Sequence, residues 1–86
     1  MVDEQLKTAL RARARELIRD GLLPTTRSAQ LSGGEGSGAT CSLCGQIIEP
    51  AELEIELRVG KPSAVHYFFH APCHSAWEQE CLAAQP

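Results

Sequence analysis

The sequence predicts a small α+β domain that needs a stabilising cross-link in addition to its hydrophobic core. Two short signatures, CSLC at residues 41–44 and HAPC at residues 70–73, offer metal-binding side chains at matching spacing. Between them, residues 52–59 alternate charged and apolar side chains, as a half-buried strand does. The hydrophobic core of a chain of only 86 residues gives a small margin of stability, so a stabilising cross-link is expected.

The net charge of −3 is unevenly distributed along the chain. Residues 1–30 hold six basic and four acidic side chains, a balance of +2, whereas residues 41–86 hold two basic and six acidic ones, a balance of −4. Neither part has the strongly basic character of a nucleic-acid footprint. Charged residues interrupt the N-terminus and no apolar run reaches the length of a membrane span, so we expect a cytoplasmic protein.

Residues 1–24 are predicted to form an N-terminal amphipathic helix, with its helical part at about residues 3–21. Asp3 can cap the first turn, and Gly21 with Pro24 gives a stop signal. The apolar positions recur at helical spacings and are Leu6, Leu10, Leu17 and Ile18. We interpret the arginines of this segment as a solvated face, and docking on an acidic partner is the alternative.

Residues 25–40 are rich in Gly and Ser and have no periodicity, which predicts a flexible linker. Gly33 to Thr40 matches the spacing of a phosphate-binding loop. However, Ala39 stands where the lysine belongs and a cysteine knuckle follows in place of a helix. We therefore do not predict a phosphate site. Whether the N-terminal helix packs on the rest of the chain or moves on this linker is left open.

Residues 41–86 are predicted to form one zinc finger domain, with a cysteine knuckle, a β-hairpin and a C-terminal helix in that order. The turn of the hairpin is GKPS at residues 60–63, and AVHYFF at residues 64–69 is the return strand. Pro72 fits the first turn of a helix that reaches about Ala84. In the first strand we expect four apolar side chains to face the core: Leu53, Ile55, Leu57 and Val59.

The metal-binding prediction rests on two residue pairs with the same spacing. Two ligands separated by two residues can chelate one ion from a tight turn, and structural zinc takes four Cys or His ligands in a tetrahedron. Reduced cytosolic thiols favour metal binding over disulfides. The proposed ligands of one Zn²⁺ per chain are Cys41, Cys44, His70 and Cys73. His74 is the alternative to His70, although its position on the helix suits joint chelation with Cys73 less well.

Three further residues are assigned structural roles. Trp77 is expected to anchor the core beneath the hairpin, and Cys81, one helical turn later, to be a buried small hydrophobic residue. His66 is expected on the surface or in a cross-strand contact. Because four protein ligands fill the zinc shell and the HxE…PCxxC deaminase signature is absent, we expect no enzyme.

The order of knuckle, hairpin and helix resembles a treble-clef finger, such as the first half of a LIM module. It is closer to the poly(ADP-ribose) polymerase-type finger, because Phe69, His70 and Cys73 match its ending and Trp77 its downstream aromatic residue. This likeness covers about residues 41–80. Over the whole chain, ARELIRDGLLP, GEGSG and CSLCGQII resemble a group of small, largely uncharacterised bacterial zinc-binding proteins, which implies a stand-alone finger.

Poly(ADP-ribose) polymerase-type fingers bind broken DNA, but here Glu52, Glu54 and Glu56 would meet phosphates with like charge. The leading hypothesis is therefore a non-enzymatic zinc protein whose N-terminal helix engages a protein partner or a second copy of the chain. A nucleic-acid-binding regulator that uses the helix arginines is the first alternative. A redox sensor that releases zinc when its thiolates are oxidised is the second.

Overall fold

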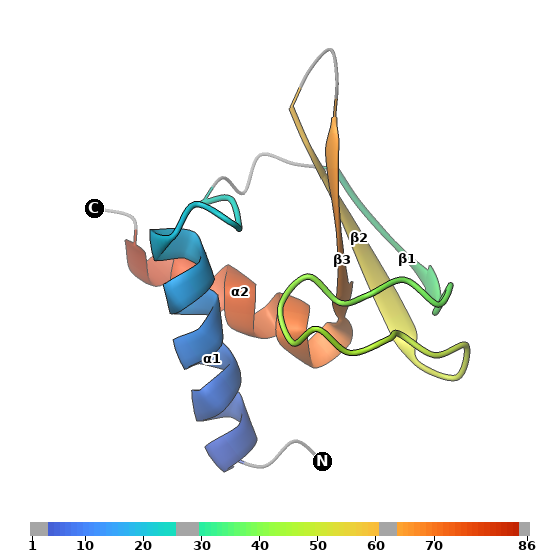
Figure 1. Ribbon diagram of the computed structural model, residues 1–86, viewed down its shortest axis with the longest axis horizontal. Helices are drawn as coiled ribbons and strands as arrows, with labels where there is room; N and C mark the ends of the chain where they lie inside the picture. Colours follow the sequence, from blue (N-terminus) through green and yellow to red (C-terminus); the bar gives the residue numbers. More distant parts are fainter. Residues whose placement is uncertain (1–3, 26–29, 61–63, 85–86) are drawn as a thin grey trace.

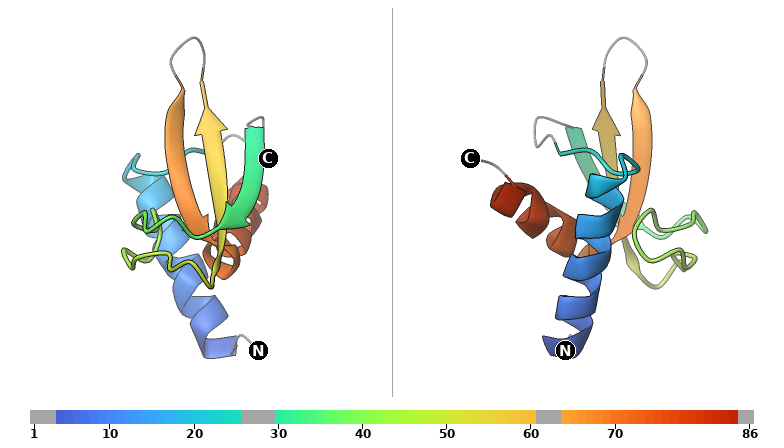
Figure 2. Two further views of the ribbon diagram at one scale, coloured as in Figure 1. Left: turned by 90° about the vertical axis from the view of Figure 1, so that its right-hand side faces the viewer. Right: turned by 60° about the vertical axis from the view of Figure 1, so that its left-hand side comes forward.

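The computed structural model describes residues 4–25, 30–60 and 64–84. It contains α1 (Glu4–Arg19), β1 (Gln30–Glu35), β2 (Leu53–Val59), β3 (Val65–His70) and α2 (Ala71–Ala84). Both helices lie on one side of a three-stranded sheet, with α2 next to the sheet and α1 packed on α2 (Figure 1; Figure 2). The predicted α+β class is confirmed. No helix among the described residues is long and apolar enough to cross a membrane.

The sheet is antiparallel, with strand order β1-β2-β3. The predicted hairpin is confirmed as the β2–β3 pair, in which Ile55 lies opposite Phe69 and Leu57 opposite Tyr67. Residues 61–63 of its predicted turn lie outside the described residues, as does the predicted cap Asp3.

The prediction of a flexible linker over residues 25–40 is wrong at residues 30–35, which form β1. This strand pairs with β2 along its whole length, from Gln30 opposite Arg58 to Glu35 opposite Leu53. All six of its residues are exposed. The sequence therefore lacks the alternation of apolar and polar side chains that marks a half-buried strand. Backbone pairing along the open edge of β2 holds β1, and such pairing requires no apolar side chain.

Gly36, directly after β1, is fixed by its neighbours. Its backbone N–H donates to the Glu52 carbonyl oxygen at 2.9 Å, and a Cβ added there would lie 2.0 Å from the Glu49 carbonyl oxygen. The glycine that suggested flexibility in the sequence is therefore required for close packing of two backbone segments.

The inward-facing pattern of β2 is confirmed in part. Leu57 is buried beneath α2, whereas Leu53, at the start of the strand, is 52% exposed. Strand alternation sets the face on which a side chain lies, but the extent of the covering helix decides its burial. Here α2 packs on β2 and β3 and makes no such contact with β1, whose residues are all exposed.

The core is centred on Trp77, as expected. Its ring stacks on Phe69 with the centroids 5.8 Å apart, and its indole Nε1–H donates to the Pro24 carbonyl oxygen at 2.9 Å. Cys81 is fully buried close to the same carbonyl. Ala14 and Leu17 of α1 join this core, so the N-terminal helix is part of one packed unit with α2.

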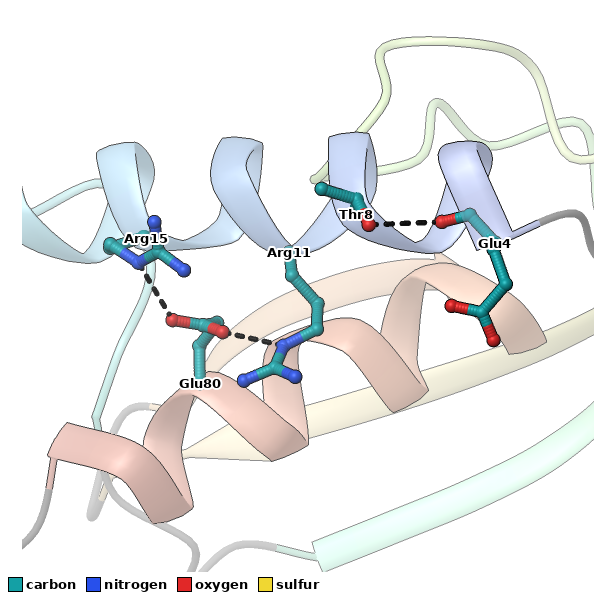
Figure 3. A network of polar contacts seen from close by, with 5 residues as sticks. All are labelled: Glu4, Thr8, Arg11, Arg15 and Glu80. Atoms are coloured by element: carbon teal, nitrogen blue, oxygen red, sulfur yellow. Dashed lines mark hydrogen bonds and ion pairs between the residues drawn. The ribbon is translucent and has the colours of Figure 1, made fainter.

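Two arginines of α1 reinforce that packing through one buried carboxylate. Arg11 Nε lies 2.7 Å from Glu80 Oε2 and Arg15 Nε lies 3.0 Å from Glu80 Oε1, while Glu80 is only 5% exposed (Figure 3). Burial alone would raise the pKa of Glu80, but the hydrogen bonds from Arg15 and Arg11 outweigh it and lower the pKa. These two arginines stay partly or largely exposed, in agreement with the predicted solvated face, and at the same time they join α1 to α2.

Candidate metal centre

The structure brings together the four side chains that the sequence singles out. Each of Cys41, Cys44, His70 and Cys73 offers one ligand atom, and these atoms all lie within 4.8 Å of one another. Cys41 and Cys73 are buried, and the other two are partly buried. The cluster is a group that could hold a metal ion, and it joins segments 26 or more residues apart in the sequence.

The first pair lies in a tight turn between β1 and β2. The Cys41 N–H donates to the Gln46 carbonyl oxygen at 2.8 Å, and the Gly45 N–H donates to the Cys41 carbonyl oxygen at 3.1 Å. Gly45 has a φ of 78°, a conformation that glycine adopts without steric cost. The turn thereby directs the Cys41 and Cys44 side chains to the same side.

This knuckle is docked on the outer edge of β3. The Ser42 N–H donates to the Phe68 carbonyl oxygen at 2.6 Å, and the Phe68 N–H donates back to Ser42 Oγ at 3.1 Å. His70 ends β3 two residues later, and Cys73 lies in the first turn of α2. The second pair therefore reaches the knuckle because the sheet edge, the strand end and the helix start meet there.

One nitrogen of His70 faces the thiols and the other faces a carboxylate. Nδ1 lies 3.4 Å from Cys44 Sγ and 4.0 Å from Cys73 Sγ. Nε2 lies 3.4 Å from Glu52 Oε1. Nδ1 is therefore the nitrogen placed to act as a ligand.

His74, the alternative ligand, lies outside the cluster. Its ring packs among aromatic side chains, with centroid distances of 5.9 Å to Phe69 and 5.6 Å to Trp77. Its Nε2 is buried and has no hydrogen-bond partner among the described residues. Burial lowers the pKa of His74, which favours the neutral imidazole in this apolar setting. Of the two histidines in the HAPCH stretch, His70 therefore lies at the cluster and His74 lies among the aromatic side chains of the core.

Hydrogen bonding and burial shift the pKa values of the cysteine thiols in opposite directions. A hydrogen bond from Cys73 lowers the pKa of Cys41 to about 4, with further help from the backbone N–H of Cys44. The same interaction raises the pKa of Cys73, and burial raises the pKa of Cys44. Hydrogen bonding within the cluster thus favours the thiolate form of Cys41, and a cation bound to all four residues would displace the thiol protons that remain.

Glu52 is a site residue that the sequence did not indicate. The strand pattern placed it among outward-facing carboxylates, and its approach to His70 depends on the turn that precedes β2. The backbone N–H of Glu52 donates to the Glu49 carbonyl oxygen at 2.9 Å, and this turn points the Glu52 side chain toward the end of β3. No spacing rule in the sequence links the two residues.

A groove of about 540 Å³ opens beside the cluster. It lies between the N-terminal half of α1 and the loop that follows the knuckle. Its lining includes two exposed apolar side chains, Leu6 at 48% and Ile47 at 58%, and two carboxylates, Glu49 and Glu52. Among the described residues that line it, none is a lysine or an arginine.

Comparison of the chain with protein-family models, curated proteins and solved structures finds no match.

Proposed function

We propose that the protein is a non-enzymatic zinc-binding module whose metal holds a protein-docking surface in shape. The observation that carries this proposal is the convergence of three thiols and one imidazole, within 4.8 Å of one another, from the knuckle, the end of β3 and the start of α2. A metal bound to all four would clamp these elements together.

The donor set and its dimensions suit zinc. Zinc binds thiolate at about 2.3 Å and imidazole nitrogen at about 2.0–2.1 Å, so a tetrahedral site places its ligand atoms about 3.5–3.8 Å apart. The His70 Nδ1 distances of 3.4 and 4.0 Å to two of the sulfurs bracket this range. Three thiolates and one imidazole also form a recognised structural zinc combination.

A structural role follows from the number of ligands. Four protein ligands complete a tetrahedral shell, whereas catalytic zinc keeps one position for water or substrate. The knuckle, the β2–β3 hairpin and α2 occur in the order of a treble-clef finger, with β1 and α1 added to it. In such a finger the metal supplies folding free energy, and the chain around it supplies the binding surface.

The groove beside the cluster supports docking of a protein segment that carries apolar and basic side chains. Leu6 and Ile47 offer apolar contacts, and Glu49 and Glu52 offer the complementary charge. Three thiolates with one Zn²⁺ would add a further formal charge of −1. Leu17 of the predicted apolar stripe is buried in the core, so the candidate interface becomes this groove, to which the stripe contributes Leu6 and Leu10.

Two observations favour a protein partner over a nucleic acid. Arg11 and Arg15 are paired with Glu80, so their charges are partly neutralised. The lining of the groove is acidic and would repel phosphates.

Site-specific photocrosslinking in cells tests the docking proposal. A photoreactive phenylalanine analogue at Ile47, in the groove, is expected to give a discrete protein adduct that is lost when Glu49 is changed to lysine. The same analogue at Leu22, which is 63% exposed and outside the groove lining, is the matched control. An adduct to nucleic acid at position 47, or identical products from both positions, would contradict the proposal.

A further inference from the structure

The Glu52 carboxylate is held in place although its side chain is 46% exposed. Oε1 accepts a hydrogen bond from the backbone N–H of Glu49 at 2.9 Å, and the backbone N–H of Glu52 donates to the Glu49 carbonyl oxygen at 2.9 Å. The Glu52 carbonyl oxygen accepts from the Gly36 N–H, also at 2.9 Å. Three hydrogen bonds thus fix both the backbone and the side chain of a residue on the surface.

The fixed oxygen is directed at the outer nitrogen of the candidate ligand His70. Oε1 lies 3.4 Å from Nε2, while Nδ1 faces the sulfurs. We propose that Glu52 is a positioning residue of the metal centre, whose carboxylate accepts the Nε2–H of His70 and thereby keeps Nδ1 unprotonated for the metal. This inference rests on the proposed function, since it requires that the cluster binds a metal.

The physical basis is the tautomer of a neutral imidazole. Only one of its ring nitrogens carries a proton, and an acceptor at that nitrogen leaves the other lone pair free for a metal. A carboxylate acceptor also makes the ligand nitrogen more basic and fixes the plane of the ring. Loss of such an outer partner typically weakens metal binding 10- to 100-fold.

Groups next to His70 and Glu52 determine how much zinc affinity is lost when Glu52 is removed, and whether another carboxylate can take its place. The backbone of Ile47 interacts with the His70 ring as well, and that interaction would remain after Glu52 is removed. The expected effect is therefore at the lower end of the range. Glu54, the next carboxylate on β2, is already engaged, because its Oε1 accepts from Ser37 N at 3.1 Å and from Ser37 Oγ at 2.7 Å.

The test is the zinc affinity of the full chain, measured by competition with a chromophoric chelator. Glu52→Ala is expected to weaken zinc binding about 10-fold. Glu52→Gln, which retains an oxygen acceptor, should lose clearly less. Glu56→Gln is the matched control, because it removes another carboxylate of β2 that lies outside the groove lining, and it is expected to leave the affinity unchanged. Equal affinities for Glu52→Ala and the unaltered protein would overturn the inference.

A second comparison separates positioning of His70 from support of the turn at residues 49–52. In a His70→Cys background, which keeps four ligands but has no imidazole, Glu52→Ala is expected to have no effect on zinc affinity. A loss of about 10-fold that persists there would assign the effect to the turn and overturn the inference.

Nitrogen-15 NMR of the zinc-loaded protein gives an independent readout that requires no ligand substitution. A metal-bound Nδ1 and a protonated Nε2 are expected for His70, and a metal-bound Nε2 would overturn the inference. A chain that binds no zinc would instead reject the proposed function itself, so the two failures are distinguishable.

Discussion

The indole of Trp77 donates a hydrogen bond to the carbonyl oxygen of Pro24, 53 residues earlier in the chain, at 2.9 Å. Pro24 follows α1, and Trp77 lies one helical turn after Cys73. The exit of the N-terminal helix is therefore anchored on the helix that carries a candidate metal ligand. This contact connects the candidate metal centre to the α1–α2 packing, and it makes the single tryptophan a reporter of both.

Removal of the metal is expected to unfold much of the chain. Structural zinc contributes about 10–16 kcal/mol of apparent binding free energy in small fingers, more than a core of this size supplies. An excess of a strong chelator should reduce the circular dichroism signal and shift the Trp77 emission to longer wavelength, and added zinc should reverse both changes. A metal-depleted protein with unchanged dichroism and emission would refute the scaffold role.

Glu80→Gln is expected to lower the free energy of unfolding of the zinc-loaded protein by about 1.5–3 kcal/mol, because it weakens two charge-assisted hydrogen bonds at a buried acceptor. Glu16→Gln is the matched control, since Glu16 pairs with Arg13 on the surface with both side chains more than half exposed. That change should cost no more than about 0.5 kcal/mol. Urea denaturation followed by Trp77 fluorescence measures both values, and equal losses would mean that the Glu80 pairs do not reinforce the helix packing.

The stabilising effect of Glu80 should also have a defined pH dependence. The folded-state pKa of Glu80 is lowered, so its contribution is complete above the unfolded pKa of about 4.3 and is lost as the pH falls through the folded value. The difference in unfolding free energy between the unaltered protein and Glu80→Gln should therefore be constant from about pH 7 to 5.5. A difference that already shrinks within this window would indicate a raised pKa and a dominant burial effect.

Gly36→Ala tests the correction to the predicted linker. The new Cβ would lie 2.0 Å from the Glu49 carbonyl oxygen, so the segment before the knuckle must shift, and we expect a loss of about 2–3 kcal/mol in unfolding free energy. Gly34→Ala is the control within β1, because a Cβ there meets nothing within 4 Å and should change stability by no more than about 0.5 kcal/mol. Similar melting temperatures for the two variants would show that residue 36 tolerates displacement.

The parts of the fold that could be predicted are those with a local signal. The CxxC turn, the alternation of residues 52–59 and the proline at the start of α2 each mark an element within a few residues. β1 has no such signal, because its side chains are exposed and its pairing partner lies beyond the knuckle. The packing of α1 on α2 has no local signal either, because it depends on contacts such as those of Glu80 with Arg11 and Arg15 across 65 or more residues.

In the candidate site, too, only the features with a local sequence signal could be predicted. Spacing singled out all four residues of the cluster, because a chelating pair is a local pattern. The choice between His70 and His74 rested on helix geometry, and the structure agrees with it because His70 ends β3 while the His74 ring turns into the aromatic core. Glu52 could not be found in this way, because its distance to His70 depends on how a turn and a strand end meet.

Native mass spectrometry of the protein produced in zinc-containing medium tests the central claim most directly. The unaltered chain, His74→Ala and Cys81→Ser should each carry one zinc ion, whereas Cys44→Ser and His70→Ala should carry none after dialysis against a weak chelator. Cys81 is the matched control for loss of a buried thiol, since it lies outside the cluster. A chain without zinc, or zinc retained by His70→Ala but lost from His74→Ala, would contradict the proposed centre.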